Sequence, residues 1–131
     1  MNREQTPLRR LWLALGVLMV LLQAAGFYTP SSGEGTLPLP PHGDKVFHAA
    51  SFALATAFAL LARLPWVAVI LFMLGHAIAS ELIQGLFMET RSGDVADGVA
   101  DVIGILFGVL AARWLARNPP EQREPGVTPP E

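Results

Sequence analysis

Cysteine is missing from the 131 residues of this chain, so the protein can form neither a disulfide framework nor a thiolate site. Charge is also scarce, because Asp, Glu, Lys and Arg together make up only 15% of the residues. The net charge of -2 is too small to bear on nucleic-acid binding, but no basic stripe with interleaved aromatic residues is present, so we expect no nucleic-acid partner. Apolar residues are abundant instead, at 52%, and this excess indicates a membrane protein rather than a soluble domain.

The apolar residues form four long blocks instead of alternating with polar ones, at about 11–28, 46–64, 66–88 and 97–116. A helix of about 20 residues crosses the hydrocarbon core of a bilayer. Backbone in lipid must also satisfy its own hydrogen bonds, which favours helices. We therefore predict an all-α polytopic membrane protein. Residues 1–117 would form one bundle of four transmembrane helices, with a polar cavity at the outer face. The first and last apolar blocks would be near the lower length limit for crossing a bilayer.

The arginines predict the orientation, because positive charge near a membrane span favours the cytoplasmic side. One side would carry seven basic residues and the other would carry Lys45 and Arg91; the seven are Arg3, Arg9, Arg10, Arg63, Arg113, Arg117 and Arg123. Both termini would then be cytoplasmic, in the inner membrane of a bacterium. The tail, 118–131, is rich in proline and charge, which predicts disorder.

The first apolar block has a second interpretation as a cleaved signal peptide. It follows three arginines and ends with the small residues Ala24, Ala25 and Gly26, as signal peptides do. Cleavage would leave the orientation of the other three helices unchanged, because Arg63 and the arginines near the end of the chain would remain. The sequence leaves this alternative open.

Ionisable residues gather at the ends of helices that would face outward. Residues three or four positions apart share a helix face. By this rule Asp44, His48 and Ser51 lie together on the second helix, and Glu81 and Gln84 on the third. Glu81 lies about 10 Å inside its helix end at about 1.5 Å per residue, which makes it the residue most in need of a partner. We expect that partner to be His48, Lys45 or Arg91, and the alternative is that Glu81 is protonated.

The fourth helix carries one stripe of acids and glycines. Its members follow the same helical spacing: Asp94, Asp97, Asp101, Gly104 and Gly108. Glycines four apart allow helices to approach closely. We therefore expect this stripe to face the bundle interior, and self-association of the chain through the glycines is an alternative.

Three pieces of sequence, taken in order, resemble the VanZ-like family of small bacterial integral membrane proteins. They read D-K-x-x-H at 44–48, E-x-x-Q at 81–84 and R-x-x-D-x-x-D at 91–97, and the resemblance extends to Gly108 over half of the chain. The chain departs from the family pattern at Asp101, where asparagine is usual. The resemblance implies a role in the cell envelope and a link to glycopeptide-antibiotic resistance.

Three kinds of site fit these residues. In the first, an anionic envelope lipid or lipid-linked cell-wall precursor is bound and processed at the outer leaflet. Glu81, His48 and Asp97 would then be catalytic, and the ligand-binding residues would be Asp44, Lys45, Gln84, Arg91, Asp94 and Asp101. In the second, the polar residues form a structural network between helices, or serve a proton- or ion-coupled transporter. In the third, carboxylates and His48 hold a divalent cation, although no ligand signature is present and no cofactor is expected.

Overall fold

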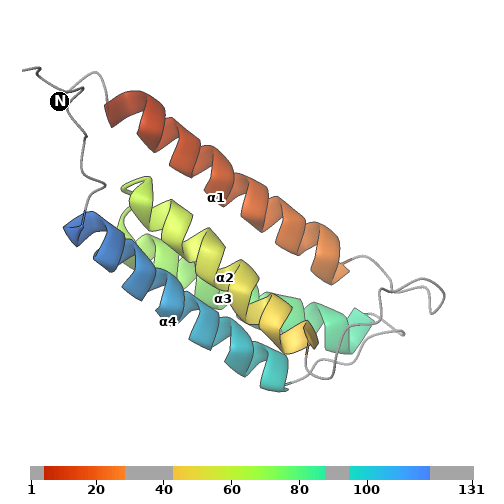
Figure 1. The fold of residues 1–131 in the computed structure, drawn as a ribbon. Coiled ribbons are helices and arrows are strands. Elements are labelled where there is room, and N and C mark those ends of the chain that lie inside the picture. The colour runs from red at the N-terminus through yellow and green to blue at the C-terminus, as the bar shows by residue number, and fades with distance from the viewer. Residues whose placement is uncertain (1–4, 29–42, 88–94, 119–131) are drawn as a thin grey trace, which may run out of the picture.

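The computed structural model describes residues 5–28, 43–87 and 95–118, and this part of the chain is all-helical. Four helices follow one another in an antiparallel bundle (Figure 1); they are α1 (Gln5–Tyr28), α2 (Gly43–Leu61), α3 (Trp66–Phe87) and α4 (Val95–Arg117). Each is long and apolar enough to cross a membrane, and together they confirm the predicted multi-pass helical bundle.

Three helices begin before the apolar blocks that predicted them, namely α1, α2 and α4, whereas α3 begins at the expected residue 66. α1 begins at Gln5 instead of near residue 11. α2 runs from Gly43 to Leu61 instead of 46–64, so both of its ends lie three residues earlier in the chain than expected. A helix does not stop where hydrophobicity stops, and Pro7 is tolerated in a first turn because its missing N–H has no partner there. The 24 residues of α1 span about 36 Å, so the helix is not near the lower limit for crossing a bilayer.

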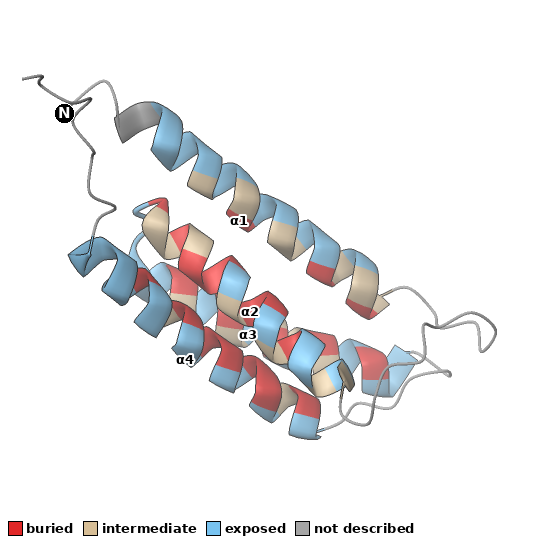
Figure 2. Cartoon of the chain, viewed as in Figure 1, coloured by how far each residue is buried: buried red, intermediate tan, exposed pale blue. Residues whose placement is uncertain are grey.

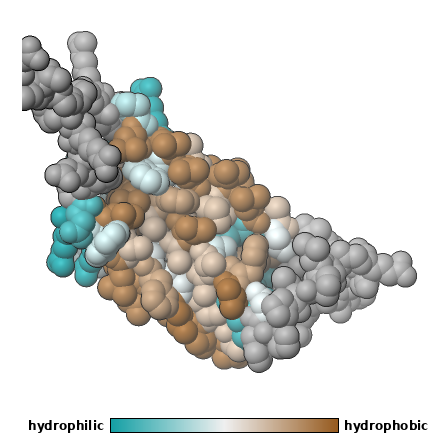
Figure 3. Space-filling view, in the orientation of Figure 1, coloured by the Kyte–Doolittle hydropathy of each residue, from teal (hydrophilic) through white to brown (hydrophobic). Residues whose placement is uncertain are grey.

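The two ends of the bundle differ in charge. We call the end with Tyr28, Gly43, Phe87 and Val95 the polar end, and the end with Leu61, Trp66 and Arg117 the arginine end. All arginines of the described residues lie toward the arginine end: Arg9, Arg10, Arg63, Arg113 and Arg117. Between the ends, apolar side chains cover much of the visible surface (Figure 3), as expected for a surface in contact with lipid.

α4 packs closely on α2 because two glycines leave room for the neighbouring backbone. A β-carbon at Gly104 would overlap the carbonyl group of Ala49, and one at Gly108 would lie 2.5 Å from the carbonyl oxygen of Ala53. Both glycines are buried. The glycine stripe therefore faces the bundle interior as expected, and these two positions are occupied within the chain.

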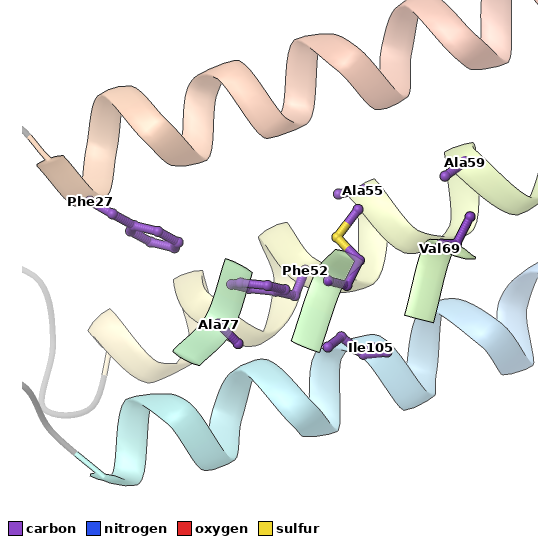
Figure 4. Packing of buried hydrophobic residues seen from close by; sticks show 8 residues of the cluster. Phe27, Phe52, Ala55, Ala59, Val69, Ala77 and Ile105 are labelled. Carbon is purple, nitrogen blue, oxygen red and sulfur yellow. The ribbon is translucent and has the colours of Figure 1, made fainter. Parts of the chain in front are cut away.

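The apolar core lies between the helices, next to the α2–α4 contact. Figure 4 shows Phe27 projecting from α1 toward Phe52 of α2, with their ring centroids 6.1 Å apart. Met73 of α3 and Ile105 of α4 belong to the same buried cluster. Each helix thus contributes at least one large apolar side chain to a shared core.

α1 is the least buried helix and lies along one side of the other three (Figures 1 and 2). Trp12 stacks on Phe58 of α2 with ring centroids 5.6 Å apart, and Arg9 Nε donates a hydrogen bond of 3.0 Å to the carbonyl oxygen of Ala62. An apolar cavity of about 390 Å³ separates part of α1 from α2 and α3, and Leu13, Val20 and Phe72 are among its lining residues.

The turn between α2 and α3 ends α2 with a left-handed residue. Arg63 has φ 60°, its N–H donates to the carbonyl of Leu60 at 2.9 Å, and the N–H of Leu64 donates to the carbonyl of Ala59 at 3.2 Å. This pair of hydrogen bonds is the Schellman motif, which usually has glycine at the position of Arg63. The Arg9 hydrogen bond to Ala62 satisfies a further carbonyl of the same helix end.

Glycine at position 63 should stabilise the turn. We expect Arg63→Gly to be more stable than Arg63→Ala by about 1 kcal/mol, because only glycine adopts the left-handed conformation without a steric cost. Both variants lose the same charge, so the comparison isolates the backbone. Unfolding of the two purified variants in the same detergent measures the difference, and equal stabilities would show that the backbone at Arg63 is not strained.

Candidate polar site

Helices α2, α3 and α4 bring ionisable side chains to the polar end of the bundle. α2 contributes Asp44, Lys45 and His48 from its first two turns, α3 contributes Glu81, and α4 contributes Asp97 and Asp101; these six residues form what we call the polar cluster. The helices are antiparallel, so the start of α2 and α4 and the end of α3 meet at the same level. The spacing argument therefore placed these residues together correctly.

Lys45 joins α2 to α4 through an ion pair. Its Nζ lies 2.8 Å from Asp97 Oδ1 and 3.5 Å from Asp44 Oδ2. The Lys45 side chain is 27% exposed, while Asp97 is 13% and Asp44 55% exposed. Asp44 therefore lies at the exposed edge of the polar cluster, whereas His48 and Ser51, which follow it at helical spacing, are buried.

His48 and Asp101 form a second, deeper contact between the same two helices. His48 Nδ1 lies 2.9 Å from Asp101 Oδ1, and the side chain of Asp101 is 0% exposed. Phe27 of α1 stacks on the imidazole with ring centroids 4.3 Å apart, which covers His48 with an apolar face. An ionised Asp101 would accept a hydrogen bond from Nδ1–H, so this pairing would fix the tautomer and orientation of the imidazole.

Glu81 completes a group of three ligand-type side chains. His48, Glu81 and Asp101 each present one donor atom, and these atoms lie within 4.8 Å of one another. Each residue comes from a different helix, and His48 and Asp101 are buried while Glu81 is partly buried. Glu81 was expected to pair with His48, and the two side chains do lie close together. Asp101 lies within the same distance of both.

Two glutamines link α1 and α3 to this end of the bundle. Gln84 Nε2 donates to the carbonyl oxygen of Phe27 at 3.2 Å, so its amide caps the end of α1. Gln23 Nε2 donates to Ser51 Oγ at 3.2 Å, and Ser51 Oγ donates to the carbonyl oxygen of His48 at 2.9 Å. Both glutamines thus position the residues around His48.

Sequence reasoning missed Gln23 and Phe27. Gln23 is 0% exposed although it lies in a long apolar run, and such a lone amide in a membrane helix signals a contact with another helix. Phe27 carried no comparable signal, because an aromatic residue near a membrane interface is common. Its role follows only from the position of His48.

Two predicted site residues, Arg91 and Asp94, lie outside the described residues. The same holds for the segments 29–42 and 88–94 and for most of the predicted tail, at 119–131. The polar cluster is therefore defined here by the residues on α2, α3 and α4.

Comparison with known proteins gives no relative from which a role could be transferred. No family model, curated protein or solved structure matches this chain.

Proposed function

We propose that this protein binds a phosphate-bearing envelope lipid, or a lipid-linked cell-wall precursor, at the polar end of its bundle. The observation that carries the proposal is the position of Lys45, which is partly exposed at the edge of a buried group of ionisable side chains. An ammonium at this depth suits a lipid headgroup, because both lie near the interface between hydrocarbon and water. His48 and Glu81 lie deeper and would exchange protons with a bound headgroup.

The proposed orientation places the polar end outside the cytoplasm. Arg9, Arg10, Arg63, Arg113 and Arg117 lie at the opposite end, and clustered positive charge favours the cytoplasmic side. Both termini would then be cytoplasmic, and the headgroup would be taken from the outer leaflet of a bacterial inner membrane.

The resemblance to the VanZ-like family agrees with this proposal. Five of its motif residues on α2, α3 and α4 meet in the polar cluster, as expected if they serve one site; they are Asp44, Lys45, His48, Glu81 and Asp97. The sixth, Gln84, lies outside the cluster and donates to the carbonyl oxygen of Phe27. Membership of that family, and with it a link to glycopeptide resistance, is part of the proposal. In this role Asp97 would hold Lys45 in place and release it toward an incoming phosphate.

A structural role for the polar cluster is the second candidate, and a specific observation favours it. Lys45 and His48 are each already paired with a carboxylate of α4, at 2.8 and 2.9 Å. Such pairs would hold α2 and α4 in register without any ligand. The two candidates differ in the effect of Glu81→Gln. A structural role predicts normal abundance and function, whereas proton exchange predicts lost function at normal abundance.

Native mass spectrometry tests headgroup binding directly. The protein is released gently from its own membranes, and retained phosphate-bearing lipids are compared between the wild type and Lys45→Gln. We expect at least a tenfold loss of retention, because a charge-assisted contact to phosphate contributes about 1.5 to 3 kcal/mol.

The matched control is Arg63→Gln, which removes a positive charge at the arginine end of the bundle. It should retain as much lipid as the wild type. Equal retention by all three proteins, or equal losses in both variants, would contradict a headgroup site at Lys45.

A further inference from the structure

The polar cluster has an excess of negative charge, which raises a difficulty for any phosphate-bearing ligand. Its carboxylates are Asp44, Glu81, Asp97 and Asp101, against a single lysine and one histidine among these described residues. Like charges repel strongly where water is partly excluded. A phosphate would therefore approach this end favourably only if a further positive charge were present.

Three residues of the polar cluster are arranged to supply that charge by holding an ion. One nitrogen of His48 and one oxygen each of Glu81 and Asp101 lie within 4.8 Å of one another. Bonds from zinc to nitrogen or oxygen are about 2.0 to 2.2 Å long, so two ligand atoms of a tetrahedral site lie about 3.4 Å apart. A pair of atoms at the 4.8 Å limit would need to close by about 1.4 Å. His48 Nδ1 and Asp101 Oδ1 already lie 2.9 Å apart, so this movement would have to come from the partly buried Glu81 side chain.

A separate observation points to a ligand at the same place. Asp101 Oδ2 is buried and has no hydrogen-bond partner among the described residues, although Oδ1 is paired with His48. A buried oxygen without a partner is costly, and such atoms in native structures commonly belong to a site for an ion or water. A cation between Asp101 and Glu81 would satisfy this oxygen.

Lys45 is a positive charge close to the proposed ion, but its carboxylate partners reduce the repulsion between the two. Its ammonium lies 2.8 Å from Asp97 and 3.5 Å from Asp44, so its charge is already compensated. Phe27 stacks on His48 and shields the imidazole on one face, and an apolar shell of this kind is common around metal sites. The surroundings of the three residues thus favour an ion.

We infer that His48, Glu81 and Asp101 bind one divalent cation of the zinc class. One imidazole nitrogen and two carboxylates suit Zn²⁺ better than Mg²⁺ or Ca²⁺, which prefer oxygen ligands alone. The three ligands come from α2, α3 and α4, which leaves a further coordination position for water or a phosphate oxygen. Binding of a phosphate oxygen at that open position rests on the proposed function, whereas binding of the ion by the three residues does not.

Zinc binding is measured on the purified full-length chain without a histidine tag. The protein is stripped with a chelator, titrated with Zn²⁺ by calorimetry, and analysed for bound metal after dialysis. We expect about one ion per chain. Affinity should fall in Asp101→Asn and in Glu81→Gln by at least the factor of about 10 to 100 that the loss of an outer-shell partner costs, because both residues are direct ligands. Mg²⁺ should not displace the zinc.

Arg113→Gln is the control, because it replaces a charged side chain by an amide at the arginine end of the bundle, away from the three ligands. Its zinc affinity should stay within about twofold of the wild type, as expected for a distant site. Helicity is compared by circular dichroism, and Glu81→Gln keeps the test decisive if Asp101→Asn does not fold. No binding by the wild type, or an equal loss in Arg113→Gln, would overturn the inference.

Lipid retention separates this inference from the proposed function. Lipid that is retained with Zn²⁺ and lost with chelator supports both. Zinc binding without any retained phosphate-bearing lipid would refute the headgroup proposal and leave the metal site standing. Lipid retained equally with and without zinc would refute the role of the ion in holding the headgroup.

Discussion

Asp101→Ala should lower the free energy of unfolding by about 3 to 5 kcal/mol, because it breaks a buried ion-pair contact and leaves one partner behind. His48 Nδ1 would lose the oxygen that lies 2.9 Å away, in a position where water cannot replace it. The imidazole would remain pressed against Phe27 by stacking. Unfolding in a fixed mixture of detergents, followed by circular dichroism, measures the loss.

Two companion variants make this prediction specific. Asp44→Ala removes an exposed carboxylate of α2 and should change stability by less than about 0.5 kcal/mol, as is usual at exposed positions. Replacing both partners, as His48→Leu with Asp101→Leu, should recover most of the stability, since no unpaired polar group remains. If Asp101→Ala costs no more than Asp44→Ala, the contact between His48 and Asp101 does not stabilise the fold.

Gly104→Ala should destabilise the protein by about 1 to 3 kcal/mol, although alanine is the better helix former. The new β-carbon would overlap the carbonyl group of Ala49, which is backbone and cannot rotate away. α4 would have to move off α2. Because Gly104 lies one turn from Asp101, the same movement would separate Asp101 from His48 and weaken zinc binding.

Gly75→Ala provides the control for this prediction. Gly75 lies within α3, and a β-carbon there would meet nothing within 4 Å. The substitution should be neutral or stabilising by up to about 1 kcal/mol, from helix propensity alone. The two alanine variants should thus differ in sign when unfolding is measured side by side, and effects of the same sign and size would rule out a close contact at Gly104.

The helical architecture could be predicted because long apolar runs have few structural solutions in a bilayer. The grouping of the polar cluster followed from helical spacing and from antiparallel order. Which side chains of the polar cluster pair with one another could not be predicted in the same way. Depth along the helix suggested that Glu81 needed a partner most, whereas Asp101 proved to be the fully buried carboxylate. Its burial comes from the close approach of α2 and α4, which sequence spacing does not reveal.

Helical spacing was also insufficient to predict which side chains at the start of α2 would contact α4. Asp44, His48 and Ser51 follow the spacing of one helix face, but Asp44 is exposed and Lys45 makes the contact with Asp97. In the first turn of a helix no preceding turn restricts the side chains, and long ones such as lysine reach around the helix. Contacts at helix ends are therefore decided by side-chain length as well as by angle.

The distance along the chain between the paired residues has a consequence for biosynthesis. Lys45 meets Asp97 across 52 residues, and His48 meets Asp101 across 53. At about 5 to 20 residues per second, a ribosome needs roughly 3 to 10 s to make the intervening stretch. During that interval α2 must enter the translocation machinery with a lysine and a histidine that have not yet met their aspartates. Insertion of α2 should therefore depend on α4, and chains truncated before residue 95 should leave α2 poorly inserted.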